Sequence, residues 1–251
     1  MRKIRLFIPD QNLQIGAAIS IAVDFHYLIN VMRLRINDQF LVFNGSDGEW
    51  LAEIITINKK DCDALIKQKV KDQYFPPKIT LAFAPVKNVR IDFVAEKGTE
   101  LGITNFQPIL TKHSVVDKIN LERFSANIKE AIEQCERLDF PQVADLIPLK
   151  DFLKKLSKDS ILILADESGN GKKSSEILPK INLDKLSEII IFIGPEGGFS
   201  KEEFDLFYSF SNLIPINLGP RILRADTAII SAITLVQEFL GDFNLKCRFQ
   251  E

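Results

Sequence analysis

The chain has 251 residues, 46% of them hydrophobic and 26% charged, a composition typical of a soluble globular protein with one large domain or two smaller ones. A formal net charge of −2 excludes a protein that coats nucleic acid over its whole surface, although it allows a local basic groove. Three scattered cysteines and two histidines indicate neither a disulfide framework nor a metal site, and no apolar run approaches the ~20 residues that span a bilayer, so we expect a cytoplasmic protein without metal or membrane.

Residues 1–72 are predicted to form mostly strands. Four short runs are rich in β-branched and aromatic residues, and a turn cluster at 44–48 separates the second run from the third. Asp24 is the expected cap of a short helix that runs through Met32. The pattern predicts a small β-barrel, with lysines along its edges that either bind nucleic acid or form a solvated surface. The four runs are 5–8, 40–43, 50–57 and 64–70.

The Tyr-Phe-Pro-Pro sequence at 74–77 is the expected domain boundary, because two prolines end strand pairing and stiffen a link. We therefore assign residues 1–72 to one domain and residues 73–251 to another. In the second domain strands and helices alternate, which predicts an α/β fold with a mostly parallel sheet and helices on both faces. The predicted strands are 79–84, 106–110, 161–165 and 189–193, and the predicted helices are 89–101, 121–138 and 149–156.

A glycine-rich turn follows the apolar run 189–193, which is expected to be a strand buried on both faces. The turn reads Gly-Pro-Glu-Gly-Gly-Phe at 194–199, and Ser200 with Glu203 forms a capping box that starts a helix. Ligands of α/β domains bind at such carboxyl ends of strands. On spacing alone, an ordinary turn is the simpler interpretation.

A second break, at 218–219, leads into a long apolar helix that Gly241 ends. Arg221, Arg224 and Asp226 fall within six residues at the start of this helix. Helix N-termini and guanidinium groups both favour negative charge, so these residues form either an anion site or a solvated, capped terminus.

The two breaks, at 194–199 and 218–228, resemble the trefoil-knotted SPOUT methyltransferases and, more narrowly, the bacterial 16S rRNA (uracil-N(3))-methyltransferases. Earlier motifs of that family are matched in the same order, so the resemblance covers nearly the whole chain. Several ordered motifs are far more specific than any one of them alone. They comprise His26 with Val31-Met32-Arg33-Leu34, Lys97 with Glu100-Leu101-Gly102, and Glu133-Gln134-Cys135 with Arg137.

The resemblance implies an activity, a fold and partners. The resembling family uses S-adenosylmethionine to methylate ring nitrogen 3 of a specific uridine, uridine 1498, in 16S rRNA of the small ribosomal subunit. For this chain the resemblance implies a PUA-like β-barrel over residues 1–72 that helps bind RNA, followed by an α/β-knot methyltransferase domain over residues 73–251. It also implies a homodimer in which the active site lies against the partner.

Three loops gathered by the knot are implied to bind the cofactor, at 164–167, 193–198 and 218–227. Their glycines allow backbone amides to approach a ligand closely, and we expect a valine in place of Gly197 to fill the ligand's space. The implied cofactor-binding residues are Leu164, Ala165, Ile193, Gly194, Pro195, Glu196, Gly197, Gly198, Leu218, Gly219, Ile222, Leu223 and Thr227.

Arg224 is expected to stabilise the oxygen of a deprotonated uracil, whereas Arg221 is expected to be structural or to face a phosphate. Glu196 and Asp226 remain alternative proton acceptors. The family commonly has glutamate where this chain has Asp226, and the shorter side chain puts a direct role as base in doubt. The residues expected to contact RNA are Arg33, Arg35, Lys97, Arg137 and Arg221.

Two other functions compete with this interpretation. A SPOUT methyltransferase could act on a different RNA position, such as a ribose hydroxyl, and a non-catalytic protein could merely dock on rRNA. The glycines at 194–198 and 219 favour a working cofactor site, and the amino-terminal motifs favour the uracil enzyme.

The final helix gives a physical reason to expect a homodimer. Its apolar residues form an arc too broad for one buried stripe, so one side can pack on the sheet while the other meets a symmetry mate. The alternative is a helix buried on most sides within its own domain. The arc consists of Ile229, Ile230, Ile233, Leu235, Val236, Phe239 and Leu240.

Overall fold

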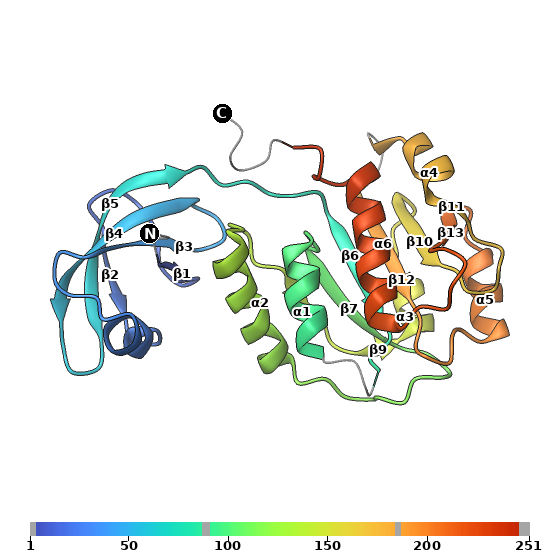
Figure 1. Ribbon diagram of the computed structural model, residues 1–251, viewed down its shortest axis with the longest axis horizontal. Coiled ribbons are helices and arrows are strands. Elements are labelled where there is room, and N and C mark those ends of the chain that lie inside the picture. The colour runs from blue at the N-terminus through green and yellow to red at the C-terminus, as the bar shows by residue number, and fades with distance from the viewer. Residues whose placement is uncertain (1–3, 87–90, 184–186, 246–251) are drawn as a thin grey trace. The chain divides into compact units, whose positions relative to one another are not determined.

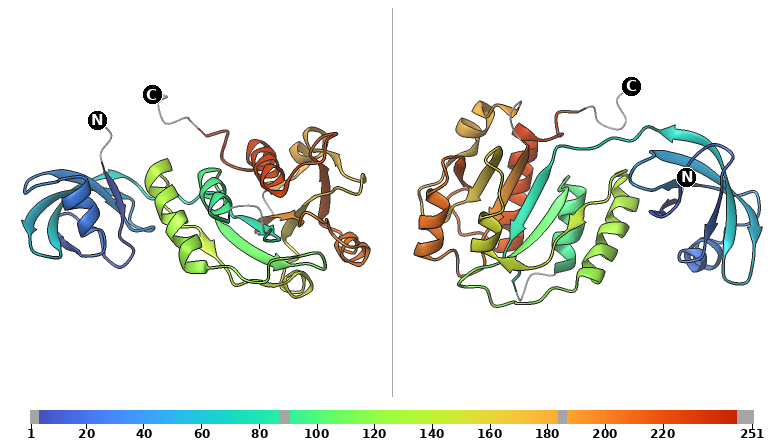
Figure 2. Two further views of the ribbon diagram at one scale, coloured as in Figure 1. Left: turned by 60° about the horizontal axis from the view of Figure 1, so that its bottom comes forward. Right: turned by 180° about the vertical axis from the view of Figure 1, so that it is seen from behind.

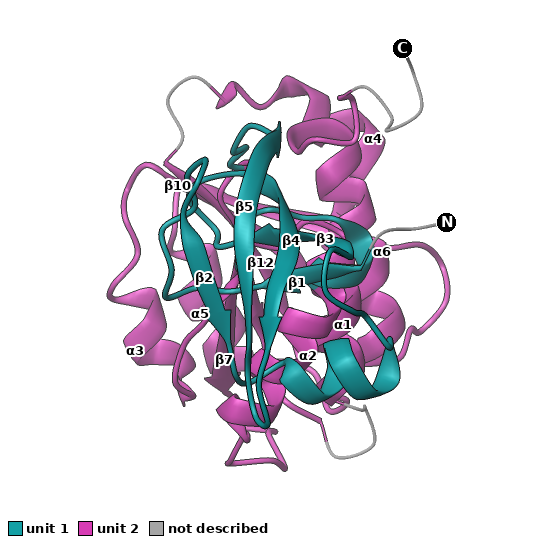
Figure 3. Ribbon diagram, turned by 90° about the vertical axis from the view of Figure 1, so that its left-hand side faces the viewer, with its two compact units in different colours: residues 1–75, 132–140 teal, residues 76–131, 141–251 magenta. Residues whose placement is uncertain are grey.

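A computed structural model describes residues 4–86, 91–183 and 187–245 (Figure 1). The chain divides into two compact units, coloured separately in Figure 3: Met1–Phe75 with Ile132–Phe140, and Pro76–Ala131 with Pro141–Glu251. The proposed domains differ from these units, because residues 73–75 and 132–140 group with the first unit.

The first unit contains a five-stranded sheet in the order β1-β3-β4-β5-β2. Strand β1 runs parallel to β3, and the other neighbours are antiparallel. The prediction that this part of the chain consists mostly of strands is confirmed. The strands are β1 (Arg5–Phe7), β2 (Ala18–Ile21), β3 (Gln39–Phe43), β4 (Glu49–Ile57) and β5 (Cys62–Lys71).

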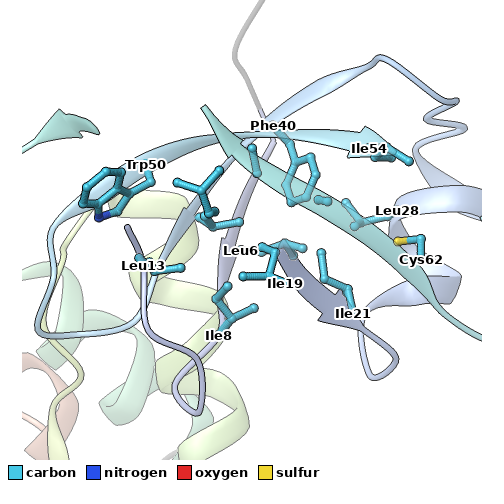
Figure 4. Close-up of a cluster of buried hydrophobic side chains, with 14 residues drawn as sticks. Leu6, Ile8, Leu13, Ile19, Ile21, Leu28, Phe40, Trp50, Ile54 and Cys62 are labelled. Carbon is cyan, nitrogen blue, oxygen red and sulfur yellow. The ribbon is translucent and has the colours of Figure 1, made fainter. Parts of the chain in front are cut away.

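Apolar side chains from every strand of this sheet meet in one core, shown in Figure 4. Alternation along a strand sends every second side chain inward, as in β2, where Ile19 and Ile21 are buried between exposed neighbours. The short helix between β2 and β3 spans His26–Val31, has π-helical geometry and adds Leu28 to the core. Phe25, and not Asp24, occupies its N-cap position, so the expected cap is wrong.

A buried ion pair ties residues 132–140 into the first unit. The side chains of Arg5 and Glu49 are almost fully buried, and the Arg5 Nε lies 2.5 Å from the Glu49 Oε1. A guanidinium near a helix C-terminus also satisfies carbonyls that lack a partner within the helix. Arg5 does this at the end of α2 (Leu121–Cys135), where its two Nη atoms donate to the backbone oxygens of Ile132, Glu133 and Arg137.

The second unit is built on a sheet whose described strand pairs are all parallel, in the order β11-β13-β10-β12-β6-β7-β8, with β9 also paired to β7. The predicted α/β fold is confirmed. The strands are β6 (Ile79–Phe83), β7 (Asn105–Leu110), β8 (Gln142–Val143), β9 (Ile147–Pro148), β10 (Ser160–Ala165), β11 (Lys172–Lys173), β12 (Glu188–Ile193) and β13 (Leu213–Asn217). The helices besides α2 are α1 (Ile91–Glu100), α3 (Leu149–Leu153), α4 (Ser174–Ile177), the 3-10 helix η2 (Leu178–Lys180), α5 (Lys201–Tyr208) and α6 (Ala225–Leu240).

Two helices end earlier than their apolar patterns predict. Helix α2 stops at Cys135 instead of residue 138, because Glu136 adopts a φ of 69° in the left-handed region, which closes a helix. Helix α3 stops at Leu153 instead of residue 156. The first two residues of the predicted helix 89–101 lie outside the described residues.

Helices cover both faces of the parallel sheet (Figure 2). On one face, side chains of α3 and α5 pack in a cluster with Leu162, Ile190 and Phe192. On the other face, Phe124 of α2 packs against Phe83 and Phe106, while α6 contacts β12 and α1. Coverage on both sides explains why these strands read as continuous apolar runs without alternation.

One buried polar side chain links α6 to the turn after α1. The Gln237 amide nitrogen donates to the Leu101 carbonyl, and its amide oxygen accepts from the Asp242 backbone nitrogen. Gly102 has a φ of 87°, and a Cβ at this position would collide with the Gln237 amide. Leu101 and Gly102 of the Glu-Leu-Gly motif therefore have a structural role in this fold.

The strand order brings three loops together. Strand β10 lies between β12 and β13, so the loops after these three strands leave the sheet at the same edge. Such carboxyl edges are the usual ligand sites of parallel α/β sheets. The trefoil knot expected from the resemblance stays a prediction.

Candidate active site

A cavity of about 580 Å³ opens at the carboxyl edge of β10, β12 and β13. Its lining residues come from the three loops that follow these strands, within 165–169, 193–198 and 217–228. This volume lies in the range of sites for small ligands and cofactors. The loops that the sequence singled out therefore surround one cavity.

The turn after β12 has specific backbone requirements. Gly198 has a φ of 68°, a conformation that L side chains rarely adopt, and a Cβ there would collide with the Glu167 carboxylate. The Gly198 amide donates to the Pro195 carbonyl at 2.9 Å, which closes the turn. The predicted capping box of Ser200 and Glu203 is confirmed at the start of α5. The turn is thus held between a buried strand and a well-capped helix.

Side chains from two other loops hold this turn from outside it. The Phe199 backbone nitrogen donates to the Glu167 Oε1 at 2.9 Å. The His113 Nδ1 lies 3.0 and 3.1 Å from the carbonyl oxygens of Gly197 and Gly198, so the tautomer with hydrogen on Nδ1 can donate to them. The loop after β7 is bound in turn by α5, because the Lys112 backbone nitrogen donates to Glu203 at 2.8 Å.

Three carboxylates line the cavity in different environments. Asp166 is buried and accepts hydrogen bonds from the Ser168 backbone and the Tyr208 hydroxyl. Desolvation and the bond to Asp166 raise the pKa of Tyr208 to about 12, so Tyr208 remains a neutral donor near pH 7. Glu167 is open to the cavity, yet protein atoms crowd its carboxyl, and this desolvation raises its pKa. Glu196 is exposed.

The positive charge of the cavity comes from the third loop. Arg221 and Arg224 are exposed and line the cavity, and Arg224 occupies the N-cap position of α6 in an extended conformation. The first turn of α6 presents backbone N–H groups and the positive end of a helix dipole at this point. The site can therefore stabilise negative charge beside the arginines and positive charge beside the carboxylates of the other two loops.

Most residues predicted to bind the cofactor line this cavity. Leu164 of β10 does not line it, because its side chain is fully buried in the core, and Gly197 and Thr227 are also absent from the lining. The predicted residues that do line it are Ala165, Ile193, Gly194, Pro195, Glu196, Gly198, Leu218, Gly219, Ile222 and Leu223.

Of the three predicted catalytic residues, Arg224 and Glu196 line the cavity and Asp226 does not. The Asp226 Oδ1 accepts hydrogen bonds from the backbone nitrogen and hydroxyl of Thr227, so it stabilises the first turn of α6. Of the two alternative proton acceptors, Glu196 is the one that lines the cavity.

The expected reason for Gly197 needs correction. A Cβ on Gly197 would approach the Cβ of His113 to 3.1 Å, so it would point toward the loop after β7 and not into the cavity. A valine at Gly197 would therefore disturb the contact with His113. Gly198 is the glycine whose replacement would place a side chain on the cavity side of the turn, against Glu167.

The residues predicted to contact RNA differ in availability. Arg33 and Arg35 are exposed in the first unit, and Arg221 lines the cavity. The Lys97 Nζ lies 2.7 Å from the Glu96 Oε1 and 2.9 Å from the Glu100 Oε1, and these hydrogen bonds raise the pKa of Lys97. The Arg137 side chain is only 12% exposed and binds both carboxylate oxygens of Asp139. Lys97 and Arg137 would have to exchange these carboxylates for phosphate.

Several lining residues were not predicted individually. Asp166 and Glu167 lie in the predicted cofactor loop 164–167, but neither side chain was given a role, although both follow a buried strand directly. The role of His113 had no such signal, because its partners lie more than 80 residues away. The further lining residues are Gly169, Asn217, Pro220, Ala225 and Ala228.

The described part of the chain contains neither a cluster of metal-binding side chains nor a helix that could span a membrane. Within it, no group of three or more His, Cys, Asp or Glu side chains could hold a metal ion. No described helix has the length and apolar character that crossing a bilayer requires.

Two family models match the chain. The model of an RNA methyltransferase domain matches residues 73–237, and that of an RNA methyltransferase PUA domain matches residues 24–67. A methyltransferase from Legionella pneumophila, whose structure contains S-adenosylmethionine, superposes with a TM-score of 0.83 at 30% identity and covers 96% of this chain and all of its own.

Named relatives agree with these models. The ribosomal RNA small subunit methyltransferase E of Neisseria gonorrhoeae, solved with S-adenosylmethionine, has a TM-score of 0.83 at 26% identity, over 96% of this chain and 100% of that one. The protein of the same name from Rickettsia conorii is 36% identical over 239 residues, which are 94% of this chain and 96% of the relative. The chain therefore belongs to the ribosomal RNA small subunit methyltransferase E family of RNA methyltransferases.

Proposed function

We propose that this protein transfers a methyl group from S-adenosylmethionine to ring nitrogen 3 of a specific uridine in 16S rRNA, in the cytoplasm, as a knotted SPOUT enzyme. The observation that carries the proposal is the single cavity at the carboxyl edge of β10, β12 and β13, in which acidic and basic side chains come from different loops. Membership of the family supports the choice of rRNA.

The cavity suits this cofactor. Its volume admits a nucleoside-sized ligand, and the glycines of the turn at 194–198 leave room for close backbone contacts. Asp166 and Glu196 provide negative charge for a cationic ligand. S-adenosylmethionine, when bound there, would supply a methyl group carried on a positively charged sulfur, and the sulfur would become a neutral thioether once the methyl group is transferred.

The protein's own residues prepare the uracil. Glu196 accepts the proton of N3, since it is an exposed carboxylate on the lining of the cavity. Arg224 stabilises the negative charge that then spreads over the two uracil oxygens, assisted by the N-terminus of α6. Arg221, three residues earlier, binds a phosphate of the RNA, and Arg33 and Arg35 bind RNA from the first unit.

Methyl mapping tests this function against its alternatives. We expect calorimetric titration to show S-adenosylmethionine binding, and incubation with small-subunit rRNA to add one methyl group. A methyl group on N3 blocks the base-pairing edge and stops reverse transcription, whereas a ribose methyl leaves that edge intact. A stop at one uridine supports the proposal. A methylated ribose would instead identify a different RNA methyltransferase, and rRNA binding without methylation would identify a docking protein.

We also propose that the protein is a homodimer. Ile230, Leu235 and Phe239 of α6 are only half-buried, and Ile222 beside the cavity is fully exposed. Pairing across a two-fold axis would cover such side chains on both copies. Light scattering at micromolar concentration should give twice the 28.5 kDa mass of the chain. A monomer that methylates rRNA at full rate would contradict both the dimer and a shared active site.

A further inference from the structure

Glu167 occupies an unusual position among the lining residues. It follows β10, yet its carboxylate accepts a hydrogen bond from the Phe199 backbone in the turn after β12. A backbone N–H group that is not paired within its own turn needs an acceptor elsewhere. For the Phe199 N–H group, that acceptor is the Glu167 carboxylate in the loop after β10. The contact thus joins two of the three loops that form the cavity.

The fit between the two loops depends on both sides. Gly198 lacks the Cβ that would collide with Glu167 Oε1, and its left-handed φ turns the Phe199 amide toward that oxygen. The Phe199 ring is buried in the cluster between the sheet and α5, in edge contact with Phe207. Because the ring fixes one side of Phe199 and the carboxylate the other, the path of residues 194–198 around the cavity is determined.

We propose that Glu167 is a positioning residue that holds the turn at 194–199 in its cofactor-binding conformation by accepting the Phe199 amide hydrogen. It acts through its oxygen as an acceptor and needs no contact of its own with the methyl donor. The inference rests on the proposed function, because the cofactor is the ligand whose site the turn borders.

Two substitutions distinguish the role of Glu167 as a hydrogen-bond acceptor from the effect of its negative charge. Glu167→Gln keeps an oxygen that can accept from Phe199, whereas Glu167→Ala removes it. Asp205→Ala is the matched control, since it removes an exposed carboxylate of α5 that does not line the cavity. All variants are first compared by thermal unfolding, so that affinities are measured on folded protein.

The first measurement is hydrogen exchange of the Phe199 amide in the cofactor-free protein. We expect exchange about tenfold faster in Glu167→Ala, which corresponds to about 1.4 kcal/mol for the lost hydrogen bond to a carboxylate, and exchange near wild type in Glu167→Gln and Asp205→Ala. The second is the affinity for S-adenosylmethionine, which should fall by a similar factor only in Glu167→Ala, while kcat at saturating cofactor stays unchanged.

Three results would overturn the inference. Unchanged exchange of the Phe199 amide in Glu167→Ala would show that the hydrogen bond to Glu167 does not protect this amide. Faster exchange of the Phe199 amide in Glu167→Ala with unchanged affinity for S-adenosylmethionine would show that the contact holds the turn but does not affect cofactor binding. Equal losses in the alanine and glutamine variants would assign the effect to the charge. If the wild-type protein binds no S-adenosylmethionine, the proposed function fails and the cofactor part of the inference with it, whereas the exchange data still decide whether Glu167 holds the turn.

Discussion

Replacing Arg224 by alanine should lower the rate of methyl transfer by about a hundredfold or more while leaving the affinity for S-adenosylmethionine nearly unchanged. The scale is that of one lost oxyanion donor. Negative charge develops on the uracil oxygens only as N3 loses its proton, so a guanidinium at this place contributes more in the transition state than in the bound ground state. Arg224 is exposed, lines the cavity and carries no side-chain capping bond, so its removal should not unfold α6.

Single-turnover kinetics with saturating cofactor measure this effect, because they isolate the chemical step from product release. Arg221→Ala is the matched control, an exposed arginine on the same loop. If Arg221 binds phosphate, its removal should raise the KM for RNA and reduce the salt dependence of RNA binding, with little change in single-turnover rate. Single-turnover rates near wild type in Arg224→Ala would refute its role, and a slow Arg221→Ala variant would transfer that role to Arg221.

The sequence predicted those parts of the fold that depend on local patterns. Continuous apolar strands follow from burial on both faces, and the capping box at Ser200 is a signal contained in four residues. The glycine breaks at strand ends marked the stretches that contain Glu196 and Arg224, and the family resemblance supplied their catalytic roles. Each of these inferences uses residues that are close together in the chain.

What could not be predicted depends on pairs that only the fold brings together. Arg5 is a charged residue near the start of the chain, and nothing local indicates that it is buried against Glu49 and the end of α2. The direction of the missing Cβ of Gly197 depends on His113, 84 residues earlier. For the same reason the sequence identified the glycine-rich turn but assigned the sterically critical position to the wrong one of two adjacent glycines.

Replacing Gly198 by alanine should weaken S-adenosylmethionine binding on the order of a hundredfold. A left-handed conformation costs an L residue about 1–2 kcal/mol, and overlap with the Glu167 carboxylate adds about 1–3 kcal/mol, while each 1.4 kcal/mol is tenfold in affinity. The turn can relieve this strain only by moving, and its movement changes the cavity lining at 193–198. Calorimetric titration of the folded variant measures the loss.

Gly16→Ala is the matched control for backbone strain alone. Gly16 has a φ of 82°, close to the 68° of Gly198, but no atom lies within 4 Å of the Cβ that alanine would add, and Gly16 belongs to the first unit. We expect it to lower the free energy of unfolding by about 1–2 kcal/mol without changing cofactor affinity. Should a folded Gly198→Ala protein bind the cofactor as tightly as Gly16→Ala does, the turn at 194–199 does not shape the cofactor site, and the cavity would need another occupant.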